Sequence, residues 1–221
     1  MKKSLAPILK NILLGALVTA SLAAGAGSAQ AALGVDFTAP DSTHLVSGTN
    51  GIVGWSFTAT QDLYVTSLGV YDHDADRNIE GAHAVGLWKA DGTLITSVSV
   101  TEPGVAHSQL LVNGKYHMVN ASASLQAGQT YVVAATVGIS DAFAFFDSAS
   151  AASYNLQFNP NLSYGNAVFS TNTIGMPGID TLSPYGNFGA NIDVTPTPIP
   201  AAAWLLGSGL LGLVRIRRKQ Q

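Results

Sequence analysis

Short segments with alternating apolar and polar side chains recur through the middle of the chain, and turn sequences separate them. Residues 63–71 and 93–100 alternate with the two-residue period of a β-strand. Asp91-Gly92 and Asn113-Gly114 are typical of β-hairpin turns in which glycine takes a positive φ. Further β-type runs occupy residues 53–58, 84–88, 109–112, 116–119, 130–137, 143–146, 167–169 and 188–194. This pattern predicts an all-β domain, an antiparallel β-sandwich of the jelly-roll or immunoglobulin-like type.

Two segments break the strand pattern. Residues 159–185 are rich in Asn, Gly, Pro and Ser, which predicts long loops or irregular edge strands. Residues 195–200 read Thr-Pro-Thr-Pro-Ile-Pro, and alternating prolines favour an extended polyproline conformation. We therefore expect one domain over residues 32–194, followed by a stiff linker over residues 195–200.

The first 31 residues have the three parts of a secretory signal peptide, which we expect to form a signal helix. Lys2, Lys3 and Lys10 come first, and an apolar run over residues 12–24 follows. Ala29 and Ala31 are small residues at the two positions that signal peptidase reads. The apolar run is shorter than the ~20 residues of a membrane-spanning helix. The segment predicts export, with signal peptidase and the export machinery as partners and cleavage after Ala31.

The middle segment is strongly acidic. All 13 Asp and Glu residues of the chain lie there, opposed by Arg77, Lys89 and Lys115, which gives a formal charge of −10. Such a domain repels phosphate backbones, so nucleic acid is excluded as an expected partner. The acidity can attract cations or basic surfaces, or serve only to keep an exported protein soluble. The chain contains no cysteine, which removes thiol chemistry and cysteine metal sites.

The C-terminal segment, residues 201–219, predicts a hydrophobic helix that enters a membrane. Residues 201–214 are apolar, and Arg215, Arg217, Arg218 and Lys219 follow. Basic residues stay on the cytoplasmic side, and Trp204 is placed near the opposite interface. The stretch is short for a permanent span.

This tail resembles the PEP-CTERM sorting signal of Gram-negative bacteria. The resemblance covers residues 196–219, and its sorting residues are Pro196, Pro198, Pro200, Trp204, Arg215, Arg217 and Arg218. Ile199 stands between two prolines where that family has its name-giving glutamate. The resemblance implies an exosortase-like membrane protease as a partner, a genome that makes exopolysaccharide, and a cell-surface or biofilm-matrix destination. A plain tail anchor is the alternative, whereas a GPI signal would end in apolar residues.

A second resemblance covers roughly residues 35–150. Residues 63–72, 83–88, 91–94 and 125–131 are similar to a β-sandwich domain of unknown function that recurs in PEP-CTERM and other bacterial surface proteins. The resemblance implies a fold and a setting, and no activity.

The most informative polar cluster is an acidic loop, which we define as residues 72–80. Oxygen ligands at alternate positions are typical of loops that wrap Ca²⁺. Arg77 and His83 stand where an EF-hand has its turn glycine and its bidentate glutamate, so this is no EF-hand. Two interpretations stay open: an irregular Ca²⁺ site between two strands, or a solvated loop whose Asp and Asn residues form turns. The candidate ligands are Asp72, Asp74, Asp76, Asn78 and Glu80.

No local motif indicates catalysis. The five histidines form neither an HExxH nor an HxH pair, and the chain has neither a GxSxG elbow nor a glycine-rich phosphate loop. Trp55 and Trp88 lie in strand-like segments, which favours core packing. His83 begins a strand and can either face the acidic loop or be a structural residue. We therefore predict no catalytic residues.

Together these features predict an exported, non-enzymatic cell-surface or extracellular-matrix protein, associated with biofilm or exopolysaccharide. It is tethered to the membrane before processing. A Ca²⁺-dependent carbohydrate-binding module is the first alternative. A glycan hydrolase is the second, because carboxylate pairs can come together in the fold.

Overall fold

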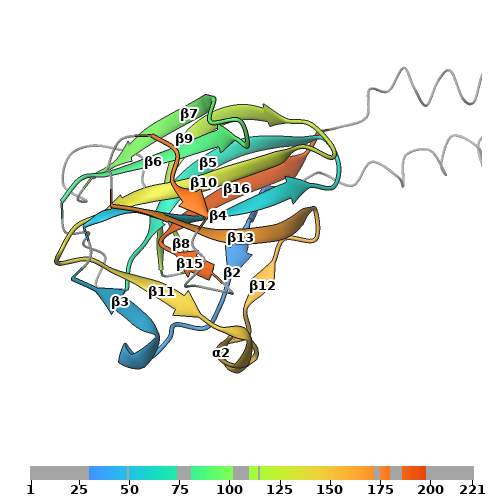
Figure 1. Ribbon diagram of the computed structural model, residues 1–221. Coiled ribbons are helices and arrows are strands. Elements are labelled where there is room, and N and C mark those ends of the chain that lie inside the picture. The colour runs from blue at the N-terminus through green and yellow to red at the C-terminus, as the bar shows by residue number, and fades with distance from the viewer. Residues whose placement is uncertain are drawn as a thin grey trace, which may run out of the picture. The chain divides into compact units, whose positions relative to one another are not determined.

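The computed structural model describes residues 30–48, 50–73, 81–101, 110–113, 115–171, 175–179 and 186–197. The chain divides into two compact units, residues 1–30 and 31–221. Strands dominate the described part of the second unit, and they pack as antiparallel sheets face to face (Figure 1). The predicted all-β sandwich is therefore confirmed. The signal helix and the C-terminal helix that the sequence predicts lie outside the described residues.

The described strands follow one another along the chain with one 3-10 turn and one short helix between them. They are β1 (Ala32–Leu33), β2 (Val35–Asp36), η1 (Ser42–His44), β3 (Leu45–Ser47), β4 (Gly51–Ala59), β5 (Leu63–Tyr71), β6 (His83–Lys89), β7 (Leu94–Val100), β8 (Leu110–Val112), β9 (Tyr116–Leu125), β10 (Thr130–Val137), β11 (Ala142–Phe146), α2 (Ser148–Ser153), β12 (Gln157–Phe158), β13 (Leu162–Ser170), β14 (Gly178–Ile179), β15 (Gly186–Phe188) and β16 (Ala190–Pro196).

Two main sheets form the sandwich. One has the strand order β1-β16-β5-β9-β8, and the other has the order β14-β13-β4-β10-β6-β7. Smaller sheets, β15-β11-β3 and β12-β2, lie beside them. The strand pairs within the described residues are antiparallel.

The core fills the space between the two main sheets. Trp55 and Phe57 of β4 share one apolar cluster with Leu63 and Leu68 of β5, and all four side chains are fully buried. β4 is buried on both faces because a smaller apolar cluster, which includes Trp88, covers the outer side of its sheet. Each fully buried side chain of this size stabilises the fold by about 1.5–3 kcal/mol. The sequence prediction that Trp55 and Trp88 serve the core is confirmed.

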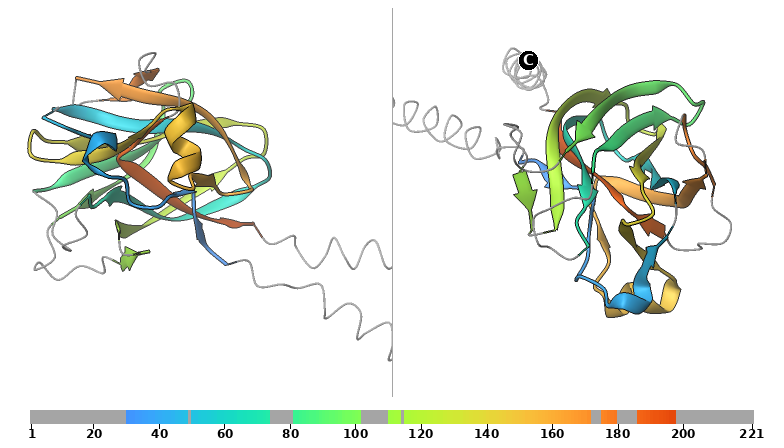
Figure 2. Two further views of the ribbon diagram at one scale, coloured as in Figure 1. Left: turned by 90° about the horizontal axis from the view of Figure 1, so that it is seen from below. Right: turned by 90° about the vertical axis from the view of Figure 1, so that its left-hand side faces the viewer.

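The first and last described strands lie side by side. Ala32 pairs with Val194, and Leu33 pairs with Asp193, so β1 extends the sheet beyond β16. Both ends of the described domain therefore leave it at one sheet edge (Figure 2, left).

The structure corrects two of the sequence predictions, one about where the domain ends and one about the segment 159–185. Thr195 and Pro196, assigned above to the linker, are the last residues of β16 and pair with Tyr64 and Leu63. Proline is tolerated there because β1 reaches only as far as Val194, so no neighbour on that side needs its missing N–H. The segment 159–185, expected to hold loops or edge strands, contains β13, which lies inside its sheet between β14 and β4.

Candidate functional site

Asp72 is the member of the predicted Ca²⁺ set that the structure describes. It follows β5 directly, and its buried carboxylate Oδ2 lies 3.1 Å from Nε2 of His117 on β9. Its backbone N–H donates to the carbonyl oxygen of Lys115 over 2.8 Å. Asp74, Asp76, Asn78 and Glu80 lie outside the described residues. The first carboxylate of the acidic loop is thus held against β9, and Ca²⁺ binding by the loop stays a prediction.

His83 holds the other end of the same loop. It is the first residue of β6 and is buried, with Nδ1 2.7 Å from the carbonyl oxygen of Thr136 and 3.7 Å from Oδ2 of Asp141. Its side chain therefore points into the domain, in the structural role that was one of the two expectations. Within the part of the chain that the structure describes, no three His, Asp or Glu side chains form a group able to hold a metal.

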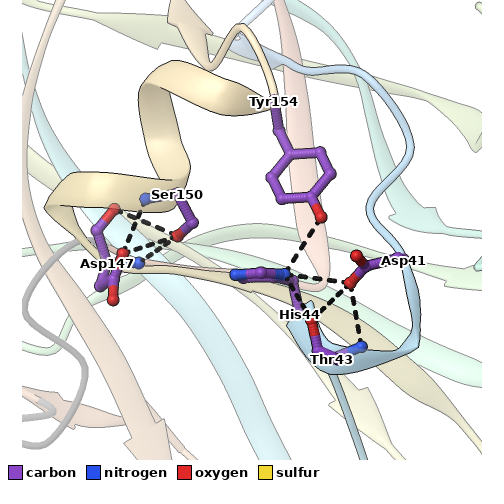
Figure 3. Close-up of polar contacts among 6 residues, drawn as sticks. All are labelled: Asp41, Thr43, His44, Asp147, Ser150 and Tyr154. Atoms are coloured by element: carbon purple, nitrogen blue, oxygen red, sulfur yellow. Dashed lines mark hydrogen bonds and ion pairs between the residues drawn. The ribbon is translucent and has the colours of Figure 1, made fainter.

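A polar cluster joins η1 to α2 (Figure 3). Asp41 caps η1 by accepting hydrogen bonds from the Thr43 backbone N–H, at 3.0 Å, and from the Thr43 hydroxyl, at 2.6 Å. Nδ1 of His44 lies 3.1 Å from Oδ1 of Asp41 and 3.1 Å from the Tyr154 hydroxyl. The Thr43 hydroxyl, and then His44, hold the pKa of the Asp41 carboxyl well below its usual range.

The serine of this cluster belongs to a helix cap. Oδ1 of Asp147 accepts from the backbone N–H groups of Ala149 and Ser150, and the Ser150 hydroxyl lies 2.8 Å from the same oxygen. This is a capping box with serine at the third position. Ser150 is buried, so its hydroxyl completes the helix end rather than facing a substrate. Ring contact between His44 and Tyr154, with centroids 4.9 Å apart, completes a structural clasp.

A groove of about 400 Å³ opens beside β1. It is lined by the segment 31–33, by Asp36 and Asn113, by residues 157–160 and by Asp193. Asp36 is already engaged, because Nζ of Lys115 lies 2.8 Å from its Oδ1 and Nδ2 of Asn113 donates to its Oδ2 over 2.8 Å.

Asp193 is the second carboxylate of the groove. Its Oδ1 is buried and meets no hydrogen-bond donor within the described residues. Burial raises the pKa of the Asp193 carboxyl, against the opposing effect of hydrogen bonds from the Ser67 side chain and the Val194 backbone.

An exposed aromatic ring lies on the outer face of the sheet that contains β16, β5 and β9. Tyr64 of β5 is 40% exposed, and its hydroxyl is hydrogen-bonded to that of Ser122 on β9. Ser124 lies directly opposite Tyr64, and Asn120, Ser122 and Ser124 are all exposed. An apolar ring face beside hydroxyl and amide groups is a combination suited to sugar rings.

Of the other predicted site residues, Ala31 lines the groove and Pro196 ends β16. Ala29, Pro198, Pro200, Trp204, Arg215, Arg217 and Arg218 lie outside the described residues. Sequence reasoning missed the clasp, although the Asp41-x-Thr43 and Asp147-x-x-Ser150 spacings are local capping signals. It also missed Asp193, whose groove partners at residues 31–33 are remote in sequence and gave no signal.

Residues 37–184 match the family described as Domain of unknown function (DUF4082). The match covers most of the described sandwich but leaves out β1, β2, β15 and β16. It extends beyond the 35–150 resemblance to include β12, β13 and β14. No curated protein and no solved structure matches the chain. Among the helices of the described residues, none has the length and apolar character needed to cross a membrane.

Proposed function

Since the chain belongs to the family Domain of unknown function (DUF4082), whose description carries no activity, we propose that it is an exported, non-enzymatic surface protein. Its place is the cell surface or extracellular matrix of a Gram-negative bacterium, in association with exopolysaccharide. Signal peptidase would release residues 1–31, and an exosortase-like membrane protease would process the tail that follows Pro196.

The observation that carries the proposal is the pairing of β1 with β16. The first strand starts at Ala32, immediately after the predicted cleavage position, and the last strand ends at Pro196, the first residue of the predicted sorting signal. Because the two strands are neighbours, a membrane-inserted tail would hold the domain by this one edge. The remaining strands and the Tyr64 face would then be free to meet matrix components.

The decisive experiment uses the native host with and without its exosortase. We expect the chain to accumulate in the membrane fraction of the deletion strain and to leave it in the parent strain. Mass spectrometry of the parent's mature chain should find a new C-terminus between residues 196 and 204. An identical C-terminus at Gln221 in both strains would exclude processing.

A second candidate function is carbohydrate binding that depends on Ca²⁺. Tyr64 favours it, because an exposed tyrosine ring flanked by Ser122 and Ser124 offers one stacking surface and several hydrogen-bonding groups. Retention of the host's exopolysaccharide should fall about tenfold in Tyr64→Ala, if the lost ring contact is worth about 1.4 kcal/mol. Ile139→Ala is the matched control, because Ile139 is an exposed apolar side chain elsewhere on the domain.

Two further results would change the proposal. Retention that disappears in chelator would favour the Ca²⁺-dependent module over a plain structural role. Release of shortened glycan by the purified chain would favour the hydrolase alternative over a non-enzymatic role.

A further inference from the structure

The groove beside β1 brings the predicted cleavage position next to a half-buried carboxylate. Ala31, Ala32 and Asp193 all line it, and Leu33 is the register partner of Asp193. Side chains of directly opposed residues in an antiparallel pair lie on the same face, with Cβ atoms about 4.5–5.5 Å apart. The Asp193 side chain therefore lies beside Leu33, the residue that directly follows Ala32.

Asp193 is short of a donor in the uncleaved chain. Its Oδ1 is buried without a hydrogen-bond partner in the described residues, and Thr195 Oγ1, two positions further along β16, is in the same condition. Burial raises the pKa of the Asp193 carboxyl, so the fold disfavours its ionised form. A buried polar atom without a hydrogen-bond partner destabilises the fold.

Among the described residues, none of the other charged groups around the groove donates a hydrogen bond to Oδ1 of Asp193. Lys115 is engaged with Asp36, and no residue that lines the groove in the described part of the chain is positively charged. A positively charged donor for Asp193 therefore has to come from a group that this lining does not yet contain. The start of β1, the adjoining strand, is where cleavage would create one.

We infer that the α-ammonium group created at Ala32 by signal cleavage pairs with the Asp193 carboxylate and completes this edge of the sheet. In the cleavage, water adds across the Ala31–Ala32 peptide bond, so that Ala31 gains a carboxylate and the Ala32 nitrogen becomes an ammonium. One backbone N–H is thereby replaced by three donors and a positive charge at the mouth of the groove. The inference rests on the export proposal above, and it makes removal of the signal peptide a stabilising step.

The pH dependence follows from the two groups. In a chain that keeps residues before Ala32, the raised pKa of Asp193 means that stability falls as pH rises through it. The ammonium offsets this loss, and its carboxylate partner raises the pKa of the amino group above the usual value of about 7.7–8.0. The gain is therefore present while the carboxyl is ionised and the amino group is protonated. It is lost as pH rises through the amino group's raised pKa, and also as pH falls through the pKa of the carboxyl.

The test compares two chains in detergent, residues 32–221 and residues 30–221, by thermal unfolding at several pH values. We expect the Tm of the chain that starts at Ala32 to be about 2–4 °C higher near pH 6.5. The difference should vanish above about pH 10, where the amino group is neutral. Asp193→Asn should abolish the difference, whereas Asp36→Asn, in the same groove but paired with Lys115, should lower both chains equally.

An NMR titration of the Asp193 carboxyl in both chains covers the case in which Asp193→Asn does not fold. The inference predicts a lower pKa of this carboxyl in the chain that starts at Ala32. Equal Tm values and equal pKa values in the two chains overturn it while leaving the export proposal intact. If N-terminal sequencing of the exported chain finds a start other than Ala32, the predicted cleavage position fails, and the inference fails with it.

Discussion

The Asp72 carboxylate and the His117 imidazole form a buried pair, with Oδ2 3.1 Å from Nε2 and side chains that are 1% and 3% exposed. The pair ties the end of β5, where the acidic loop begins, to β9. Buried polar groups of this kind are retained in a fold only where each one satisfies the other. Asp72 is thus a structural residue whatever the rest of the loop binds.

Breaking this pair should destabilise the domain. Either Asp72→Ala or His117→Ala removes this contact from the other buried group, and we expect a loss of about 1–3 kcal/mol in the free energy of unfolding. The double variant should lose less than the sum of the two, because the second substitution removes a group that has already lost this contact. Urea denaturation measures all three. Strict additivity would show that the two side chains do not interact.

The hairpin turn between β6 and β7 offers a test of backbone conformation. Gly92 has φ of +89°, which side chains with a Cβ atom rarely adopt. Gly92→Val should therefore lower the free energy of unfolding by about 1 kcal/mol or more. Gly178→Val is the control, because nothing lies within 4 Å of a Cβ there and its φ is ordinary. Equal melting of the two variants would contradict the turn assignment.

Ca²⁺ binding by the acidic loop is testable through stability. A ligand that binds only the folded state adds about 2.7 kcal/mol at a hundredfold excess over its Kd. We expect Asp74→Ala to abolish this increment while the fold in chelator stays intact. Asp91→Ala is a suitable control, because Asp91 belongs to the β6–β7 turn and bonds to Thr93. The same Tm in chelator and in millimolar Ca²⁺ would favour the solvated-loop interpretation.

Tyr71 should make the domain sensitive to alkali. Burial raises its pKa to about 12, and the neighbouring Asp72 carboxylate adds to the rise. Because the unfolded value is about 10, this contribution to stability is fully present below pH 10 and is lost as pH rises through about 12. In Tyr71→Phe, stability should fall by about 1.4 kcal/mol less for each pH unit in that window.

At neutral pH the same variant should cost little. The Tyr71 hydroxyl is buried and has no hydrogen-bond partner within the described part of the chain, so its removal leaves no group unpaired. Chemical denaturation at several pH values measures both effects. Parallel curves for Tyr71→Phe and the parent up to pH 12 would contradict the raised pKa.

The sandwich could be predicted from sequence because most strands alternate locally and end at turn dipeptides. β5 and β10 have the expected bounds for this reason. Only residues 167–169 of β13 were predicted, because the exposed residues before them are Ser, Gly and Asn, and a bulge between Tyr164 and Ala167 interrupts the alternation. Pro196 was assigned to a linker because proline content outweighed the strand before it.

The groove could not be predicted, since it depends on contacts between the two ends of the domain. Asp193 meets the segment 31–33 only because β1 and β16 pair, and no short-range pattern encodes that pairing. The clasp of His44 and Tyr154 has the same origin, with 110 residues between its members. The local capping spacings are visible in the sequence, but they do not indicate which distant side chain hydrogen-bonds to the capped segment.

The tail prediction follows from where β16 ends. Pro196 pairs with Leu63, and the N–H of Thr197 donates to the carbonyl oxygen of Asp62 over 3.1 Å, so a truncation should keep both residues. A chain that ends at Thr197 should be exported, soluble and as stable as the parent within about 0.5 kcal/mol, because the sheet is intact. A chain that ends at Ile192 is the control, and it should fail to fold because it loses the last strand residues that pair with β1 and β5.

Basic residues at the tail's end should set its topology. Moving Arg215, Arg217, Arg218 and Lys219 through a bilayer costs about 2.5–3.5 kcal/mol each on insertion scales, so they should hold the hydrophobic segment at the cytoplasmic face. Replacing all four with Gln keeps the apolar run but removes most of this barrier. We expect the tail to be processed more slowly and a larger share of the protein to appear in the soluble fraction. Replacing each of the three arginines with Lys, and Lys219 with Arg, preserves the positive charge and should keep the chain in the membrane fraction. Identical partitioning of the Gln variant, the charge-preserving variant and the parent between membrane and soluble fractions would show that the basic cluster does not anchor the chain.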